Sequence, residues 1–101
     1  MHTTFQRRLF IVSSKQCETA RLMTNDTTSD VLINSEYASM SDAAKNEAAI
    51  KIDELAKTYT TPFDMSFPLM VKDFAQVASQ YNISKATLFC VYMAYKSAGQ
   101  S

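Results

Sequence analysis

Three apolar stripes at helical spacing constrain the fold of this chain most strongly. They lie in residues 42–59, 67–81 and 85–98. Apolar residues that recur every three or four positions line up along one side of an α-helix. Short helices need tertiary packing to be stable in water, so these three should bury their stripes against one another. The sequence therefore predicts an all-α fold, a small bundle of three helices.

Residues with known capping preferences stand at the expected helix ends. Ser41, Ser66 and Ser84 precede the first, second and third predicted helix. A serine hydroxyl at this position accepts a hydrogen bond from an otherwise unpaired backbone N–H of the first turn. Pro62 disfavours continuation of the first helix, and Asn82 readily adopts the left-handed conformation that ends helices. These signals predict short turns between the three helices.

The first forty residues show no comparable pattern. Residues 1–23 carry Arg7, Arg8, Lys15 and Arg21 against Glu18, which is four positive charges against one negative charge. Residues 9–12 form a continuous apolar run that periodicity alone cannot assign to a strand or a helix. Residues 24–41 are rich in Asn, Asp, Ser and Thr, as linkers are. We therefore expect an irregular basic extension with a polar linker in residues 1–40 and a helical domain in residues 41–101.

The cysteines and the hydropathy bear on the compartment. Cys17 and Cys90 form no CxxC motif and no disulfide framework, which a reducing, intracellular compartment explains most simply. The basic, hydroxyl-rich start resembles a mitochondrial transit peptide, so the cytoplasm and the mitochondrion both stay open. No apolar run reaches the roughly 18 residues of a transmembrane helix, so no membrane span is expected.

The inventory of reactive side chains disfavours an enzyme. His2 is the only histidine, so a His-based triad or a multi-histidine metal site lacks its residues. Gly99 is the only glycine, whereas phosphate-binding loops need several. Cys90 lies in an apolar helix, where a buried thiol keeps a high pKa. We therefore expect no catalytic activity, no cofactor and no metal.

Residues 76–88, QVASQYNISKATL, resemble the helix-turn-helix pattern of bacterial and phage DNA-binding proteins. Ala78 matches the small residue of the first helix, and Asn82 takes the turn position that is usually glycine. Ile83, Ser84 and Thr87 match the start of the second helix. The resemblance extends over about residues 70–96 and implies a bihelical unit, with DNA binding as the family's function.

The second helix of this unit departs from a DNA-reading helix. By the family's geometry its outward face would present Lys85, Ala86, Phe89, Cys90 and Met93. Helices that read DNA place polar or basic side chains there, and only Lys85 qualifies. The formal net charge of zero also differs from the basic excess that is usual in nucleic-acid-binding proteins. A helix that is apolar nearly all round should be covered on both sides. The cover is the amino-terminal segment, a second copy or a different protein.

Two functional hypotheses follow, and the first is favoured. It is a non-catalytic subunit or adaptor that binds another protein, or a second copy of itself, through Phe89 and Met93, with Met65 and Met70 as neighbours. The second is a helix-turn-helix regulator that contacts DNA phosphates and grooves. Its basic contacts would be Lys72, Lys85, Lys96, Arg7 and Arg8.

Overall fold

The computed structural model describes residues 12–59 and 63–98, with side chains described in 12–59 and 70–98. Over this part of the chain the structure contains five helices and no strand. They are α2 (Ser14–Thr24), α3 (Asp30–Ser39), α4 (Asp42–Ala56), α5 (Phe63–Gln80) and α6 (Lys85–Ser97). The all-α class is confirmed. The prediction of three helices after an irregular extension was wrong, because α2 and α3 lie in the segment expected to be irregular.

Local caps explain why this polar segment forms helices. The Ser13 hydroxyl accepts a hydrogen bond from the Gln16 N–H at 3.1 Å, and the Gln16 side chain accepts one from the Ser13 N–H at 3.0 Å. This capping box starts α2. Asn25, with φ 54°, ends α2 in the left-handed conformation, and Ser29 caps α3. The hydroxyl and amide side chains typical of a linker are here caps and turns between two short helices.

The caps of the later helices are confirmed in part. The hydroxyls of Ser41 and Ser84 accept hydrogen bonds from first-turn N–H groups at 3.0 and 3.2 Å. Asn82, with φ 57°, takes the left-handed conformation in the turn after α5. Ser66 is not a cap, because α5 begins at Phe63 and Ser66 lies inside the helix.

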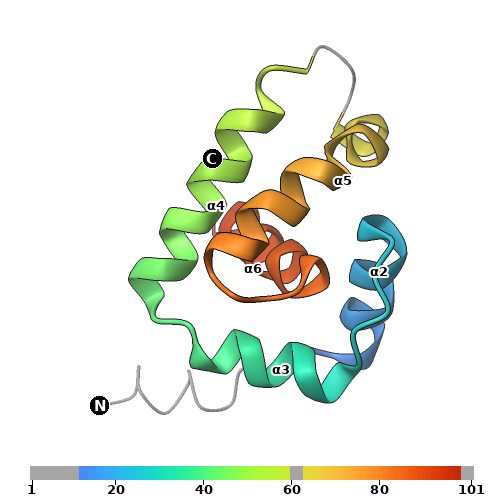
Figure 1. The fold of residues 1–101 in the computed structure, drawn as a ribbon, viewed down its shortest axis with the longest axis vertical. Helices are drawn as coiled ribbons and strands as arrows, with labels where there is room; N and C mark the ends of the chain where they lie inside the picture. The colour runs from blue at the N-terminus through green and yellow to red at the C-terminus, as the bar shows by residue number, and fades with distance from the viewer. Residues whose placement is uncertain (1–11, 60–62, 99–101) are drawn as a thin grey trace.

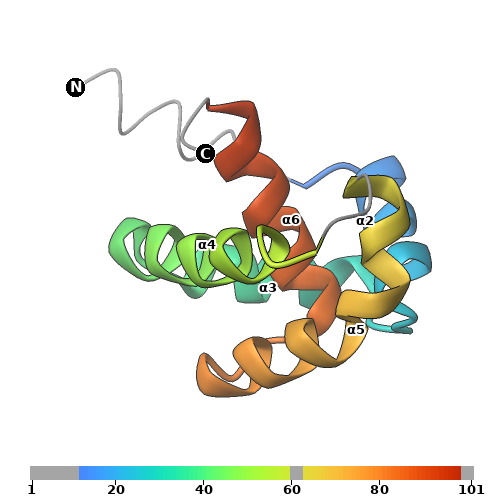
Figure 2. The same ribbon diagram turned by 90° about the horizontal axis from the view of Figure 1, so that it is seen from above.

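Helix α6 lies at the centre of the molecule and packs against the other four described helices (Figure 1). Every residue from Ala86 to Tyr92 is buried. The carboxyl-terminal end of α6 projects beyond its neighbours (Figure 2). The expectation that this apolar helix is covered on both sides is therefore confirmed for its first half. Part of the cover comes from α2 and α3 of the same chain.

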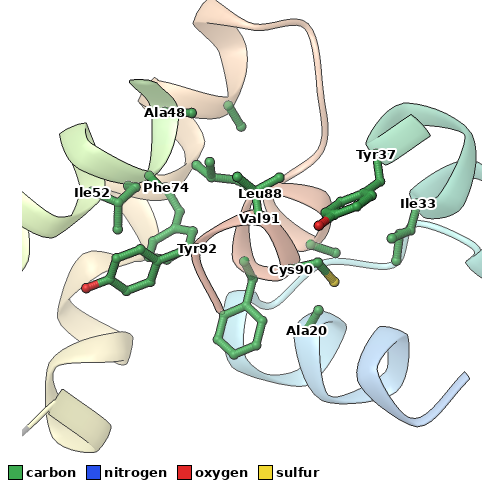
Figure 3. Close-up of a cluster of buried hydrophobic side chains, with 14 of the residues drawn as sticks. Ala20, Ile33, Tyr37, Ala48, Ile52, Phe74, Leu88, Cys90, Val91 and Tyr92 are labelled. Carbon is green, nitrogen blue, oxygen red and sulfur yellow. The ribbon is translucent and has the colours of Figure 1, made fainter. Parts of the chain in front are cut away.

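The buried side chains form one cluster around α6 (Figure 3). Ile52 and Phe74 lie on one side of Leu88, and Ile33 and Tyr37 of α3 lie on the other side. Each large apolar side chain buried in this way contributes about 1.5–3 kcal/mol. This core contains side chains from both sides of residue 40.

Candidate functional site

Two carboxylates from the amino-terminal half of the chain hold the first turn of α6. Asp26, between α2 and α3, accepts a hydrogen bond from the Ala86 N–H at 3.0 Å. Glu36 of α3 accepts one from the Ser84 N–H at 3.0 Å and one from the Thr87 hydroxyl at 2.6 Å. Negative charge is favoured at the positive end of a helix dipole. Charge-assisted hydrogen bonds therefore fasten the α2–α3 pair to α6.

These carboxylates stand where a helix-turn-helix protein would approach DNA. Burial opposes ionisation of Asp26, but hydrogen bonds from backbone N–H groups and a hydroxyl outweigh it and lower its pKa. Lys85, the one polar residue of the predicted DNA-reading face, donates to the backbone carbonyl of Asn25 at 3.4 Å. Negative charge on Asp26 and Glu36 opposes a DNA phosphate at this end of α6.

Lys96, the other predicted nucleic-acid contact on α6, lies far from Lys85. Lys96 lies eleven residues further along α6, which corresponds to about 16 Å of helix axis. The Lys96 amine is 3.9 Å from the Asp53 carboxylate. Lys72 is exposed on α5, and Arg7 and Arg8 lie outside the described residues. Lys85 and Lys96 therefore lie near opposite ends of α6 and do not form one basic cluster.

The described side chains that the sequence groups into a protein interface differ in exposure. Met70 and Phe89 are 0% and 6% exposed, and the Phe89 ring lies 6.4 Å from the ring of Phe74 in the core. Phe89 was expected to contact a partner, whereas in the structure other helices of the same chain cover it. Met93 is only partly buried. Met65 lies in the part of α5 whose side chains are outside the described set.

Met93 borders an open hollow of about 370 Å³ beside the last turns of α6, here named the α6 groove. A second hollow of about 690 Å³ adjoins it on the α4 side. The two hollows share Tyr37, Ala94 and Ala98 as lining residues. The small alanine side chains, together with the projecting end of α6, leave this region open. The apolar lining of the α6 groove is formed by Val12, Tyr37, Cys90, Met93, Ala94 and Ala98.

The titratable groups of the α6 groove are poorly suited to catalysis. Burial, with a smaller contribution from nearby Cys17, raises the pKa of the Cys90 thiol to about 12. Burial also raises the pKa of the Tyr37 phenol, and the Lys45 amine lies 3.9 Å from the centre of its ring. Both acidic groups are therefore neutral near pH 7. The groove can accept an apolar group, but its described side chains offer no activated nucleophile there.

Sequence reasoning missed a second apolar feature, on the α2–α3 pair. Leu22 and Val31 are 79% and 80% exposed. In α3 the buried positions are Ile33 and Tyr37, four residues apart, which places Val31 on the outside. That spacing would have identified Val31 once residues 30–39 were recognised as a helix. Isolated exposed apolar residues are common on soluble proteins, so these two do not define a site.

Among the described residues, no group of three or more His, Cys, Asp or Glu side chains is placed to hold a metal ion. No helix within residues 12–59 and 63–98 is both long and apolar enough to cross a membrane. Comparison of the chain with known proteins found no matching family model, no matching curated protein and no matching solved structure.

Proposed function

We propose that this protein is a non-catalytic helical subunit or adaptor that binds another protein, or a second copy of itself, through the α6 groove. The observation that carries this proposal is the partly exposed Met93 in an apolar hollow. Methionine adapts its shape to a partner. Each large apolar partner side chain that fills the hollow would contribute about 1.5–3 kcal/mol, before the cost of ordering is subtracted.

The chemistry of the described side chains supports binding over catalysis. The raised pKa of Cys90 leaves a neutral thiol at physiological pH. Cys17 is also buried, and burial raises the pKa of its thiol, so the basic neighbours Lys15 and Arg21 do not activate it. Two unpaired thiols support a reducing compartment as the place of action, either the cytoplasm or the mitochondrion.

The test compares the wild-type chain with Met93→Asp and with Val31→Asp, a matched apolar-to-acid change outside the groove. Each tagged chain is purified from the native source, and co-purifying proteins are identified by mass spectrometry. Size-exclusion chromatography of the purified chains reports self-association. We expect wild type and Val31→Asp to keep the same partner or the same oligomer, and Met93→Asp to lose it with its helices intact. Identical assembly of all three chains would overturn the proposal.

A helix-turn-helix regulator is the second candidate, because the turn between α5 and α6 has the local geometry of that pattern. Asn82 takes positive φ at the turn, and Ser84 caps the second helix. The covered face of α6 and the carboxylates of Asp26 and Glu36 at its first turn weigh against this candidate. It predicts duplex binding that weakens steeply with salt. A mobility-shift assay at low salt without any duplex binding would eliminate it.

A further inference from the structure

We propose that the apolar run Leu9, Phe10 and Ile11 of the same chain occupies the α6 groove in the free protein, so that a partner binds there by displacing it. Residues 1–11 lie outside the described part of the chain, so only their sequence enters the argument. The position of Val12 and the apolar lining of the groove support its occupation by residues 9–11, independently of any partner. Displacement by a partner rests on the proposed function.

Val12 fixes the point at which this segment joins the folded domain. The Val12 N–H donates to Asn34 Oδ1 at 2.8 Å, and the Val12 carbonyl accepts from Asn34 Nδ2 at 3.1 Å. The Val12 side chain is buried and lines the α6 groove. One amide side chain thus pairs with both polar backbone groups of Val12. Val12, to which residues 1–11 are joined, therefore lies in the wall of the groove.

The short tether favours the chain's own segment over a second copy. Ile11 is bonded directly to Val12, and three extended residues reach at most about 10 Å. A ligand on such a tether acts at a high effective concentration, of millimolar order for short linkers. The same segment of another molecule meets the groove only at the concentration of the free protein.

The chemistry of the segment matches that of the groove. Leu9, Phe10 and Ile11 are large apolar residues in sequence, and water disfavours their joint exposure. The groove offers Met93, whose sulfur makes favourable contacts with aromatic rings, and the aromatic ring of Tyr37. The segment and the groove are therefore both apolar, and Val12 joins one to the other.

The direct test uses the unmodified full chain and the nuclear Overhauser effect at the Met93 methyl group. We expect contacts from side-chain protons of Leu9, Phe10 or Ile11 to this methyl, arising within one molecule. A mixture of labelled and unlabelled chains separates them from contacts between molecules. Contacts found only between molecules would place a second copy in the groove and overturn the proposal. The absence of any contact from these three residues would also overturn it.

A variant pair gives an independent readout. Phe10→Asp should let dilute peroxide oxidise Met93 several-fold faster than in wild type, whereas Thr4→Asp, a control in the same terminal segment, should leave the rate unchanged. Mass spectrometry of peptides resolves each methionine. Met70, which is fully buried, should stay protected in both variants and reports an intact core. Equal Met93 oxidation in wild type and an intact Phe10→Asp chain would mean that Phe10 does not cover the groove.

Partner binding separates this inference from the proposed function. If residues 9–11 cover the groove, Phe10→Asp should strengthen binding of the partner that Met93→Asp loses. Unchanged binding in Phe10→Asp, with the methyl contacts present in wild type, would overturn displacement and leave the proposed function standing. If the proposed function is wrong, Met93→Asp should bind the partner as wild type does.

Discussion

The two halves of α6 are both apolar, yet they stand in different surroundings. Residues 86–92 are all buried, and two carboxylates hold the turn at which they begin. Residues 93–98 are partly buried or exposed, and Met93, Ala94, Ser97 and Ala98 line the α6 groove. The first half organises the fold, because the other described helices pack around α6. The second half borders the groove, where we propose that residues 9–11 or a partner contact it.

The largest expected effect is on stability, and it differs between a side-chain truncation in the first half of α6 and one in the second half. Leu88→Ala should lower the free energy of unfolding by about 2–5 kcal/mol, because Leu88 is fully buried and the change leaves a cavity. Met93→Ala should cost less than about 1 kcal/mol, because Met93 is partly exposed. Urea denaturation measures both. Equal losses would erase the distinction between the two halves.

The carboxylate of Glu36 tests the contact that fastens α3 to α6. Glu36→Ala removes the acceptor for the Ser84 N–H and the Thr87 hydroxyl, and should cost about 2–3 kcal/mol. Glu18→Ala, a change at an exposed position of α2, is the matched control and should stay within about 0.5 kcal/mol. If both variants unfold at the same urea concentration, the first turn of α6 is not held in this way.

The last buried residue of α6 also carries a polar contact. The Tyr92 hydroxyl donates to the buried Asp53 carboxylate at 2.9 Å, and Lys57 lies 3.3 Å from the same carboxylate. Tyr92→Phe should lower the free energy of unfolding by about 1.5 kcal/mol, since Asp53 loses one donor and keeps its lysines. Thermal denaturation measures the loss. A variant as stable as wild type would show that this hydrogen bond adds nothing to the core.

The smallest expected effect is the acid dependence of stability. The pKa of Asp26 is lower in the folded chain than in the unfolded chain. Its contribution is therefore fully present above about pH 4 and is lost as the pH falls through the folded-state value. Asp26→Asn should remove part of this acid-induced loss, as urea denaturation at stepwise lower pH would show. An unchanged pH profile in Asp26→Asn would contradict this role of Asp26.

The later helices were predictable because their local signals and their apolar stripes agree. Ser41 and Ser84 cap helices that bury several apolar side chains, and Asn82 takes the left-handed conformation in the turn between α5 and α6. The earlier helices were missed because their core positions are few. In α2 the buried positions are Cys17, Ala20 and Thr24, none of which is a large apolar residue. Such a helix depends on its contact with α6, which sequence periodicity does not reveal.

The site was predictable only in part, for a related reason. Met93 was identified from the apolar surface of its helix, and the structure places it beside a groove. Phe89 was grouped with it because the two residues share a face, four positions apart. Whether such a face is covered depends on how the other helices pack against α6, and two of them, α2 and α3, were not expected to be helices. The groove also needs Val12 and Tyr37 from distant parts of the chain, so no single segment encodes it.

The reactivity of Cys90 tests most directly the claim that the chain itself covers the first half of α6. Cys90 is 8% exposed, and burial raises its pKa to about 12. At neutral pH, a thiol reagent should modify Cys90 of the folded chain far more slowly than a cysteine in an unstructured peptide, and the rate should rise as urea unfolds the protein. Peptide mapping distinguishes Cys90 from Cys17. Modification of Cys90 in the absence of urea as fast as a cysteine in an unstructured peptide would contradict the account.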